Sequence, residues 1–383
     1  MPRHSYDVVV VGGGIQGSST AYYAARYGLR VLIVEQHSIG SGTAAASGWA
    51  VVRQTKSDPM ILRLAARSAA LWAELARDTS APYRQNGSYL LFRGSAEEVT
   101  VAERAAWLKS HGVEVTMLGP AALHRSLPCV RRDVSGASYV DIDGEVDPVA
   151  ACRSLVTAAE SLGAVVAEDT TVEGLLIGDR GVTGVRLAGG GMTHEIRAPV
   201  VVLAGGPRTA PLLDDVGVQL PVRLQRGEQL VTEPTGRVMT GRIMSARYVQ
   251  GKHSADRPAG EIGVGLAVGQ GPDGRIRIGS TRDSSAEATP TVRGRELLLA
   301  EAARYLRGVA SLPVQRQTVG SRVASTSGRP IVGPVPGVGG LAVTTGHGGD
   351  GISLAPLSGA ALAAWCAGTG YDADVLNVPI EPG

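Results

Sequence analysis

The pattern of apolar and polar positions divides the chain into alternating strands and helices. Residues 8–11 are four consecutive valines, and the apolar run 29–34 ends at Glu35. Unbroken apolar runs of this length are typical of strands that are buried on both faces of a parallel sheet. The small-residue stretch 18–27 between them predicts a helix that ends near Gly28. The start of the chain therefore predicts a β-α-β unit.

The rest of the chain continues this alternation. Asp58 and Asp147 each precede a proline, which predicts an N-cap followed by the first helical residue. Helices are predicted over residues 59–78, 96–111, 120–127, 148–162, 292–308 and 351–367. Strands are predicted over residues 88–93, 113–118, 137–142, 164–167, 171–177, 181–187, 193–197, 200–203, 318–324 and 341–345. Residues 224–232, 242–248, 261–268 and 275–280 alternate in polarity, which predicts half-buried antiparallel strands.

These elements predict two discontinuous domains, one α/β and one α+β. The first is a Rossmann-like nucleotide-binding domain of residues 1–54, 145–221 and 325–383. The second is a substrate-binding domain with an antiparallel sheet, formed by residues 55–144 and 222–324. With 383 residues the chain is long enough for two substantial cores.

A glycine pattern follows the first predicted strand at once. Gly12, Gly14 and Gly17 have the spacing G-x-G-x-x-G. The first glycine allows a tight turn, the second lets a pyrophosphate approach the backbone, and the third lets helix and strand pack closely. Glu35 closes the second strand, where an acid accepts hydrogen bonds from ribose hydroxyls. The unit predicts a dinucleotide site; the alternative is an ordinary glycine turn without a ligand.

Composition and charge exclude several other classes of protein. The net charge is only +2, which gives no indication of nucleic-acid binding. The three cysteines, Cys129, Cys152 and Cys366, are far apart and have no metal-binding spacing. No apolar run is long enough for a transmembrane segment, and residues 1–6 are too short and polar for a signal peptide. We therefore expect a cytoplasmic protein without a bound metal.

Three later segments, taken with the N-terminal pattern, resemble one known family. Residues 226–234 (RGEQLVTEP), 274–281 (GRIRIGST) and 345–356 (TGHGGDGISLAP) occur in the order and spacing of that family. The chain resembles the D-amino-acid oxidase-like family of FAD-dependent amine oxidoreductases, which includes glycine oxidase, sarcosine oxidases and dye-linked proline and hydroxyproline dehydrogenases. The resemblance covers nearly the whole chain. It implies that the dinucleotide is FAD and that the first domain binds it.

The resemblance also implies which residues contact FAD. The glycines of residues 346–351 leave backbone N–H groups bare at a helix start, where they can donate to the anionic edge of a reduced flavin. His347 is expected either beside the flavin or as a loop residue bonded to the backbone. The predicted cofactor contacts are Gly12, Gly14, Ile15, Gln16, Gly17, Glu35, Gln36, Ser41, Gly42, Thr43, Ser47, Val172, Ala204, Gly205, Gly346, His347, Gly348, Gly349, Gly351 and Ile352.

Members of the family that oxidise amino acids hold the substrate carboxylate with an arginine. Arg322 matches the position of that arginine in glycine oxidase-like members, and Arg53 matches one in monomeric sarcosine oxidase. Tyr248 and Arg277 are further candidates for the substrate pocket. Asp350 stands where sarcosine oxidase-like members have a lysine, so it is predicted to meet a cationic group of the substrate or, as the favoured alternative, to cap the helix that follows.

Two departures from the family predict non-covalent FAD. No cysteine stands at Gly320 or Ser321, where related oxidases tether the flavin, and residues 44–46 are alanines where related dehydrogenases have a histidine. The implied reaction is the oxidation of a C–N bond by hydride transfer from Cα to flavin N5, giving an imine that hydrolyses.

Electrons are expected to pass to O2 or another acceptor, and separate partner subunits remain open. The alternatives are a flavin-binding electron-transfer or structural subunit of a larger dehydrogenase, and an aromatic flavin monooxygenase.

Overall fold

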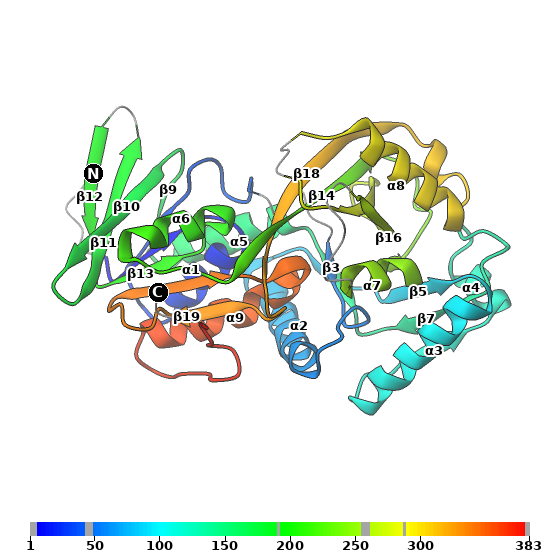
Figure 1. The fold of residues 1–383 in the computed structure, drawn as a ribbon, viewed down its shortest axis with the longest axis horizontal. Helices are drawn as coiled ribbons and strands as arrows, with labels where there is room; N and C mark the ends of the chain where they lie inside the picture. The colour runs from blue at the N-terminus through cyan, green and yellow to red at the C-terminus, as the bar shows by residue number, and fades with distance from the viewer. Residues whose placement is uncertain (1–5, 43–48, 190–191, 254–260, 286–288, 380–383) are drawn as a thin grey trace.

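The computed structural model describes residues 6–42, 49–189, 192–253, 261–285 and 289–379, which form two lobes (Figure 1). The helices are α1 (Ile15–Arg26), α2 (Pro59–Thr79), α3 (Gly94–Ser110), α4 (Pro120–Ser126), α5 (Pro148–Ser161), α6 (Thr209–Leu213), α7 (Ala246–His253), α8 (Val292–Tyr305) and α9 (Gly351–Cys366).

The strands belong to four sheets. The six-stranded sheet contains β19 (Ile331–Pro334), β20 (Leu341–Thr345), β13 (Val200–Leu203), β1 (Val8–Val11), β2 (Val31–Val34) and β9 (Val165–Ala167), in this order. The eight-stranded sheet contains, in order, β18 (Val314–Ser325), β14 (Val222–Thr232), β17 (Ile276–Arg282), β16 (Gly263–Gln270), β15 (Arg242–Ser245), β5 (Ser88–Phe92), β7 (Gly136–Val140) and β6 (Thr116–Leu118). Two small sheets contain β10 (Thr171–Gly178), β11 (Gly181–Gly189) and β12 (Met192–Arg197), and β3 (Ala50–Val51), β8 (Gly144–Val146) and β4 (Tyr83–Gln85).

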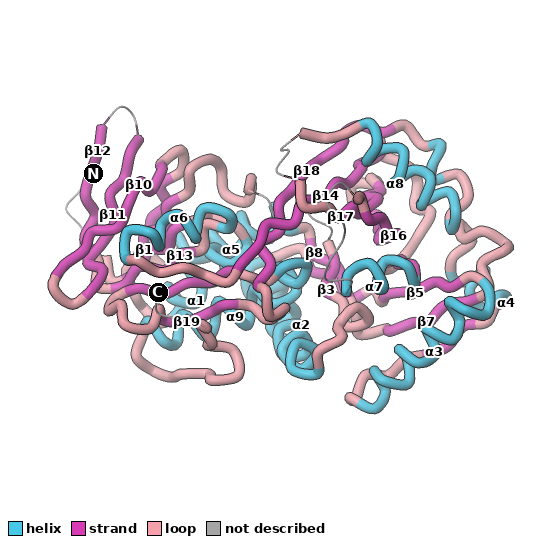
Figure 2. The backbone as a smooth tube through the Cα atoms, viewed as in Figure 1, coloured by secondary structure: helices cyan, strands magenta, loops and turns pink. Residues whose placement is uncertain are grey.

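The six-stranded sheet is the middle layer of the first lobe. Its strands are parallel, except that β19 is antiparallel to β20. Val8 and Val10 of β1 pack into the core shared with α1, α2, α5 and α9, whereas Val9 and Val11 pack into the core on the other face, toward β10, β11 and α6. Figure 2 shows these helical and strand layers. The strand is covered on both faces, as its unbroken valine run predicts.

The second lobe is organised around the eight-stranded sheet. Strands β14 and β18 form a long antiparallel pair that reaches from one lobe into the other (Figure 1). Helix α8 packs against β14, β16 and β17. Leu298, Ala302 and Tyr305 of this helix join Leu230, Ile278 and Leu266 in a single apolar core. The sheet and its covering helix therefore fix the strands that face the first lobe.

Most of the predicted elements are present, and three predictions about the second sheet are wrong. The predicted strand 242–248 ends at Ser245, and Tyr248 lies on helix α7. Strand β15 also pairs parallel with β5, although it is antiparallel to β16. Strands β16 and β17 are buried almost throughout rather than half-buried, because α8 packs against them and other strands flank them on both edges.

The predicted division into domains stays a proposal, with one feature against its first boundary. All strands of the six-stranded sheet lie within residues 1–54, 145–221 and 325–383. The predicted division places helix α2 in the second domain, but its residues Ile61, Leu64 and Trp72 pack in the core of the first lobe. The boundary at residue 55 therefore separates this helix from its packing partners.

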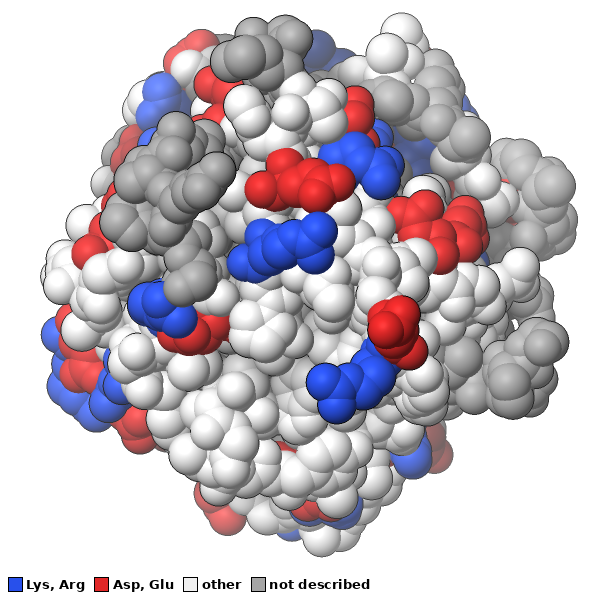
Figure 3. Space-filling view, turned by 90° about the vertical axis from the view of Figure 1, so that its left-hand side faces the viewer, with Lys and Arg blue, Asp and Glu red and all other residues white. Residues whose placement is uncertain are grey.

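Two further features concern the charges on the surface and the length of the helices. On the face shown in Figure 3, basic and acidic side chains are interspersed rather than gathered by sign. Among the described helices, none is both long and apolar enough to cross a lipid bilayer.

Candidate active site

A cavity lies where the two lobes meet. One end is lined by the loops that follow β1, β13 and β20, at the carboxyl ends of parallel strands, which is where open α/β sheets bind ligands. The other end is lined by residues of β14, β15, β16, β17 and β18 and by Tyr248 of α7. We call these the nucleotide end and the sheet end. One space thus joins both lobes.

The turn after β1 requires glycine at two positions for two different reasons. Gly12 has a φ of +105°, and a Cβ there would lie 2.6 Å from the carbonyl oxygen of Ala204. A Cβ on Gly17 would lie 1.9 Å from the carbonyl oxygen of Gly12. Gly14 lines the cavity, and a Cβ there would meet no protein atom within 4 Å. Gly12 and Gly17 therefore shape the turn, whereas Gly14 keeps space free in the cavity.

The polar groups of this turn suit a phosphate and a ribose. Helix α1 begins without a side-chain cap, so its first N–H groups remain available beside the cavity. The carboxylate of Glu35 accepts hydrogen bonds from the N–H of Gly13 at 2.7 Å and of His37 at 3.0 Å. A carboxylate has about four lone-pair sites, so Glu35 retains capacity for a ligand hydroxyl.

Gln16 joins the two glycine-rich loops, which are far apart in the sequence. Its side-chain amide donates to the carbonyl oxygen of Gly351 at 2.8 Å, and its amide oxygen accepts from the hydroxyl of Thr344 at 3.2 Å. The start of α1 is thereby fixed against the start of α9. The nucleotide end is a single unit made from both ends of the chain.

The loop after β20 is built for close approach by a ligand. Gly346 and Gly348 have φ values of +72° and +54°, and α9 starts without a side-chain cap. His347 shares a hydrogen bond between its Nε2 and the hydroxyl of Ser358 at 3.1 Å. Burial lowers the pKa of His347 to about 4, against the opposing charge of Asp350. The imidazole is therefore neutral near pH 7.

The structure brings most of the predicted cofactor residues to the nucleotide end. Gly17 and Ser41 do not line the cavity, and Thr43 and Ser47 lie outside the described residues. Those that line it are Gly12, Gly14, Ile15, Gln16, Glu35, Gln36, Gly42, Val172, Ala204, Gly205, Gly346, His347, Gly348, Gly349, Gly351 and Ile352.

Arg322 is the cationic group that β18 presents to the sheet end. Its guanidinium lies over Gly227, where a Cβ would meet the two terminal nitrogens at 2.3 and 2.7 Å. Its protein hydrogen bonds are long, at 3.4 Å to the carbonyl oxygen of Arg226 and 3.5 Å to that of Thr281. No carboxylate of the described residues is within ion-pair distance. Burial, and next the charge of Arg282, lower the pKa of Arg322 to about 10, so it stays cationic at neutral pH.

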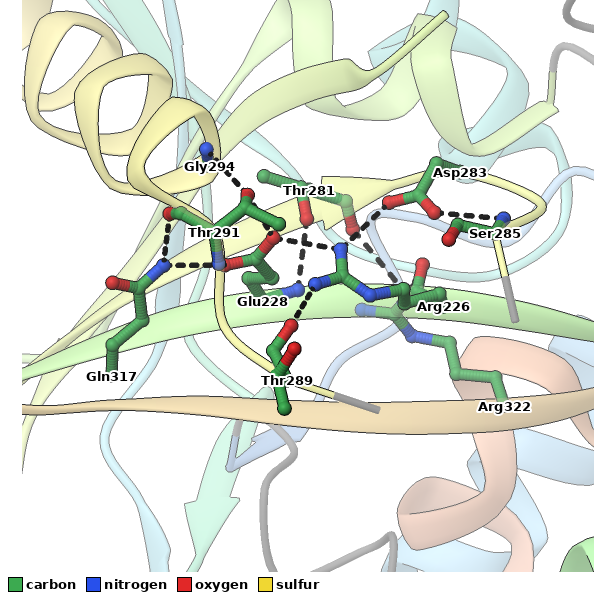
Figure 4. A network of polar contacts seen from close by, with 10 residues as sticks. All are labelled: Arg226, Glu228, Thr281, Asp283, Ser285, Thr289, Thr291, Gly294, Gln317 and Arg322. Carbon is green, nitrogen blue, oxygen red and sulfur yellow. Dashed lines mark hydrogen bonds and ion pairs between the residues drawn. The ribbon is translucent and has the colours of Figure 1, made fainter. Parts of the chain in front are cut away.

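Arg226 lies close to Arg322 and is engaged in a different way (Figure 4). Its Nη1 is 2.7 Å from Glu228 and 3.1 Å from Asp283. Glu228 also accepts hydrogen bonds from the N–H and hydroxyl of Thr291, at the start of α8, and from Gln317. This network ties β14, β17, β18 and α8 together. Arg226 is therefore a structural arginine, and Arg322 has capacity left for a ligand.

Of the other predicted substrate residues, Tyr248 lines the cavity, whereas Arg53, Arg277 and Asp350 do not. Tyr248 lines the sheet end. Arg53 is buried in an ion pair with Asp143 at 3.0 Å. Arg277 pairs with Asp273 at 3.2 Å and stacks over Trp49, with its guanidinium carbon 3.5 Å from the ring centre. Both arginines have protein partners and are not among the cavity-lining residues.

The favoured expectation for Asp350, that it caps α9, is wrong. Its side chain makes no capping hydrogen bond to that helix. It forms an ion pair with Lys56, whose side chain is only 2% exposed. The two residues are 294 positions apart, so no local pattern indicates the pair. The Asp350 carboxylate therefore pairs with the buried ammonium group of Lys56 and accepts no hydrogen bond from the first N–H groups of α9.

Sequence reasoning missed several cavity residues, of which Arg242 is the most informative. It is the first residue of β15, and its side chain is buried at the sheet end. No motif marks it, and only the pairing of β15 with β16 brings it there. The other missed polar lining residues are Thr170, Thr171, Arg208, Gln229, Ser280, Ser321, Thr344 and Thr345.

The donor set fits FAD and does not indicate a metal. The open side of Gly14, the uncapped helix starts and Glu35 match a pyrophosphate and a ribose, and the glycine loop after β20 leaves room for a flat ring. Within the part of the chain that the structure describes, no group of three or more His, Cys, Asp or Glu side chains could hold a metal ion.

Comparison with known proteins agrees with this geometry. The family model "FAD dependent oxidoreductase" matches residues 7–365. Glycine oxidase of Pseudomonas aeruginosa is 29% identical over 92% of this chain and 93% of its own length. Hydrogen cyanide synthase subunit HcnC of the same organism is 25% identical, over 94% of this chain and 92% of its own. The crystal structure of iminodiacetate oxidase from Chelativorans sp. is 25% identical, with a TM-score of 0.80 over 95% of this chain and 96% of that one.

Proposed function

Because the chain belongs to the family of FAD-dependent oxidoreductases, we propose that it oxidises the C–N bond of a small amine or amino acid. The observation that carries this proposal is the single cavity, with a nucleotide end built from glycine loops and a sheet end that presents Arg322. Relatives named for the oxidation of glycine and of iminodiacetate support an amine substrate.

When bound, FAD supplies a hydride acceptor for the carbon next to the substrate nitrogen, so that the substrate becomes an imine and water then hydrolyses it. The residues of this chain have to orient the substrate rather than activate it. Arg322 holds a carboxylate through its planar fork of donors. Its desolvated position strengthens that contact relative to water.

The nucleotide end would hold the cofactor through backbone groups. The first turn of α1 and Glu35 would bind the pyrophosphate and ribose, and the residues 346–351 would lie against the flavin ring. His347 stays neutral near pH 7, so it adds no positive charge and serves as a hydrogen-bonding neighbour. This division leaves the chemistry to the cofactor and the positioning to the protein.

FAD would be bound without a covalent link. Cys129, Cys152 and Cys366 are not among the cavity-lining residues, and Gly320 and Ser321 replace the tethering cysteine of related oxidases. Precipitation with acid should therefore leave the yellow colour in the supernatant. Flavin that stays with the precipitated protein would contradict this part of the proposal.

The electron acceptor would be O2 or a partner, with a cytoplasmic location. Lys56 is committed to Asp350, so it does not serve as a free cation at the cavity. The relative HcnC is named as a subunit of hydrogen cyanide synthase, which favours, as a second candidate, the role of a subunit in a multi-subunit dehydrogenase. Purified protein that is bleached by an amine but reoxidised only by a dye or partner fraction would support that candidate.

The direct test is anaerobic mixing of the FAD-loaded protein with a panel of amines and amino acids. The panel includes glycine, sarcosine, proline, D-amino acids and iminodiacetate. We expect at least one to bleach the flavin absorbance, and air or a dye to restore it. A panel that leaves the flavin oxidised, with bleaching by NADPH instead, would replace the proposal by a monooxygenase.

A further inference from the structure

Arg242 lines the cavity, and two nitrogens of its buried guanidinium have no hydrogen-bond partner within the described residues. Its side chain is 3% exposed, and its Nη2 donates to the carbonyl oxygen of Ala267 at 2.9 Å. Its Nε and Nη1 have no hydrogen-bond partner within the described residues. A guanidinium carries five N–H donors, and leaving buried ones unpaired costs free energy. A buried arginine of this kind in the lining of a cavity indicates an anionic ligand.

The only carboxylate close to Arg242 within the described residues is shared. Glu145 lies 3.8 Å from Nη1 of Arg242, beyond hydrogen-bond distance. It also lies 3.6 Å from Arg84 and accepts a hydrogen bond from Asn86 at 2.9 Å. One carboxylate therefore serves two arginines, and the pair Arg84 and Arg242 keeps an excess positive charge. That excess faces the cavity only through Arg242, because Arg84 does not line it.

Arg242 and Arg322 reach the cavity from separate strands. Arg322 bonds to the carbonyl oxygens of Arg226 and Thr281, on β14 and β17, whereas Arg242 donates to the carbonyl oxygen of Ala267 on β16. Ala267 pairs with Gly279 of β17, two residues before Thr281, so the two side chains approach each other although their own strands are not neighbours. Tyr248 lines the same cavity as both arginines. Such a pair suits two anionic groups on one molecule better than a single carboxylate.

A third arginine strengthens the positive field at Tyr248. The guanidinium carbon of Arg282 is 5.7 Å from the centre of the Tyr248 ring. Arg282 bonds to the side-chain oxygen of Gln225 at 3.0 Å, and its Nη2 has no hydrogen-bond partner within the described residues. Its side chain is buried, and no carboxylate of the described residues is within ion-pair distance. Arg282 does not itself line the cavity, but its charge adds to the positive field beside Arg322.

We propose that the substrate is an amine with two carboxylates, one held by Arg322 and the second by Arg242. This inference rests on the proposed function, since it assigns the substrate class of the same cavity. Arg322 sets the reacting end, whereas Arg242 selects for the second carboxylate. A substrate with one carboxylate would leave the Arg242 donors unpaired, which disfavours its binding.

The test uses the FAD-loaded protein and acids that cannot be oxidised. Acetate and propionate are compared with malonate, succinate and glutarate by the change in flavin absorbance or by calorimetry. We expect the best dicarboxylate to bind about 10- to 100-fold more tightly than acetate, as a charge-assisted pair implies. Arg242→Gln should reduce this ratio to about one and leave acetate binding within about threefold.

Three further variants separate recognition from structure. Arg322→Gln should weaken acetate and the dicarboxylates alike. Arg316→Gln is the control, because Arg316 is an exposed arginine on β18 that does not line the cavity, and it should preserve both affinities. Arg242→Lys keeps a cation at the site but loses the planar fork of donors, so it should lower the ratio in part and serves as the test if Arg242→Gln does not fold.

The outcomes are distinct from those of the amine panel. Dicarboxylates that bind no more tightly than acetate would overturn the inference, and so would an Arg242→Gln variant that weakens both classes equally. Bleaching by monocarboxylic amines alone, without selection for dicarboxylates, would refute the two-carboxylate substrate and keep the proposed function. Selective dicarboxylate binding without bleaching by any amine would refute the proposed function and keep the anion site.

Discussion

Backbone conformation shapes one end of the cavity, whereas side chains determine the character of the other. At the nucleotide end the shape comes from the backbone: Gly12 and Gly346 adopt positive φ, and Gly14 leaves its side open. At the sheet end the character comes from side chains such as Arg242 and Arg322, which strand pairing brings into one cavity. The first end depends on the absence of side chains, and the second depends on which strands are neighbours.

The two ends also differ in whether their polar side chains are bonded to the protein or remain available to a ligand. The side chain of Gln16, at the start of α1, bonds to Thr344 of β20 and to Gly351 of α9, so the two glycine-rich segments of the nucleotide end are held together. At the sheet end, Arg226 is saturated by carboxylates, while Arg322 beside it has only long contacts to carbonyl oxygens. Substitutions at the first end should therefore affect folding and cofactor content, and those at the second should affect substrate.

The largest effect is expected at Gly17. A Cβ would lie 1.9 Å from the carbonyl oxygen of Gly12, and neither backbone can move away without opening the turn. Gly17→Ala should therefore give little folded, FAD-containing protein. Gly14→Ala should fold with nearly the Tm of the unchanged protein freed of FAD, but it should retain little FAD, because its Cβ would occupy open space in the lining of the cavity. Flavin absorbance per protein and thermal unfolding measure both.

The control for this pair is Gly236→Ala. Gly236 is exposed, has no positive φ, and a Cβ there would meet no other atom within 4 Å. The variant should match the unchanged protein in Tm and FAD content. Equal FAD content in Gly14→Ala and the control would contradict a backbone-built phosphate site.

The next largest effect distinguishes the neighbouring arginines. Arg226→Met leaves the carboxylates of Glu228 and Asp283 without their shared cation, which should cost about 4–5 kcal/mol of unfolding free energy. Arg322→Met breaks no ion pair and should change stability by less than about 1 kcal/mol. Urea unfolding of both variants measures the difference. Equal losses would mean that Arg322 is also structural.

A smaller loss is expected from the ion pair between Lys56 and Asp350. Lys56→Met should destabilise the protein by about 3 kcal/mol, at the lower end for a buried pair, because the Asp350 side chain is 17% exposed. The double variant Lys56→Met/Asp350→Asn should recover part of the loss. A double-mutant cycle measures the coupling, and additive losses would argue against the pair.

The effect expected at His347 is the smallest at neutral pH, because it develops only in acid. Because burial lowers its pKa to about 4 from 6.5, the unfolded chain binds more protons than the folded one between these values. This contribution to stability is present above about pH 6.5 and is lost as the pH falls toward 4. His347→Gln should flatten the curve of Tm against pH in that range and leave it unchanged above pH 7. Parallel curves throughout would contradict this assignment.

The sequence was sufficient where local geometry dictates the residue type. Gly12 and Gly346 need positive φ, and the four valines of β1 need apolar cover on both faces, so these features were predicted. Register and pairing between distant segments leave no such mark. Arg242 was missed because its role depends on β15 lying beside β16, and Tyr248 was placed on a strand although it lies on α7.

The same reason explains the residues whose surroundings differ from expectation. Arg53 and Arg277 were chosen by position in a motif, but each has an acidic partner that only the folded chain brings close. Asp350 was expected to cap a helix because capping is a local interaction, whereas Lys56 reaches it from the other end of the chain. Long-range ion pairs are set by tertiary structure, so a single sequence does not reveal them.

The central claim is that the two ends of the cavity are separable, one for FAD and one for a carboxylated amine. It is tested most directly by anaerobic flavin bleaching in the unchanged protein and in Arg322→Ala, with the best amine of the panel. We predict the same FAD content in both proteins. The bleaching efficiency, which is the limiting rate of flavin bleaching divided by the amine concentration that gives half of it, should be about 100- to 1000-fold lower in Arg322→Ala. Equal bleaching efficiency, or loss of FAD from the variant, would contradict the account.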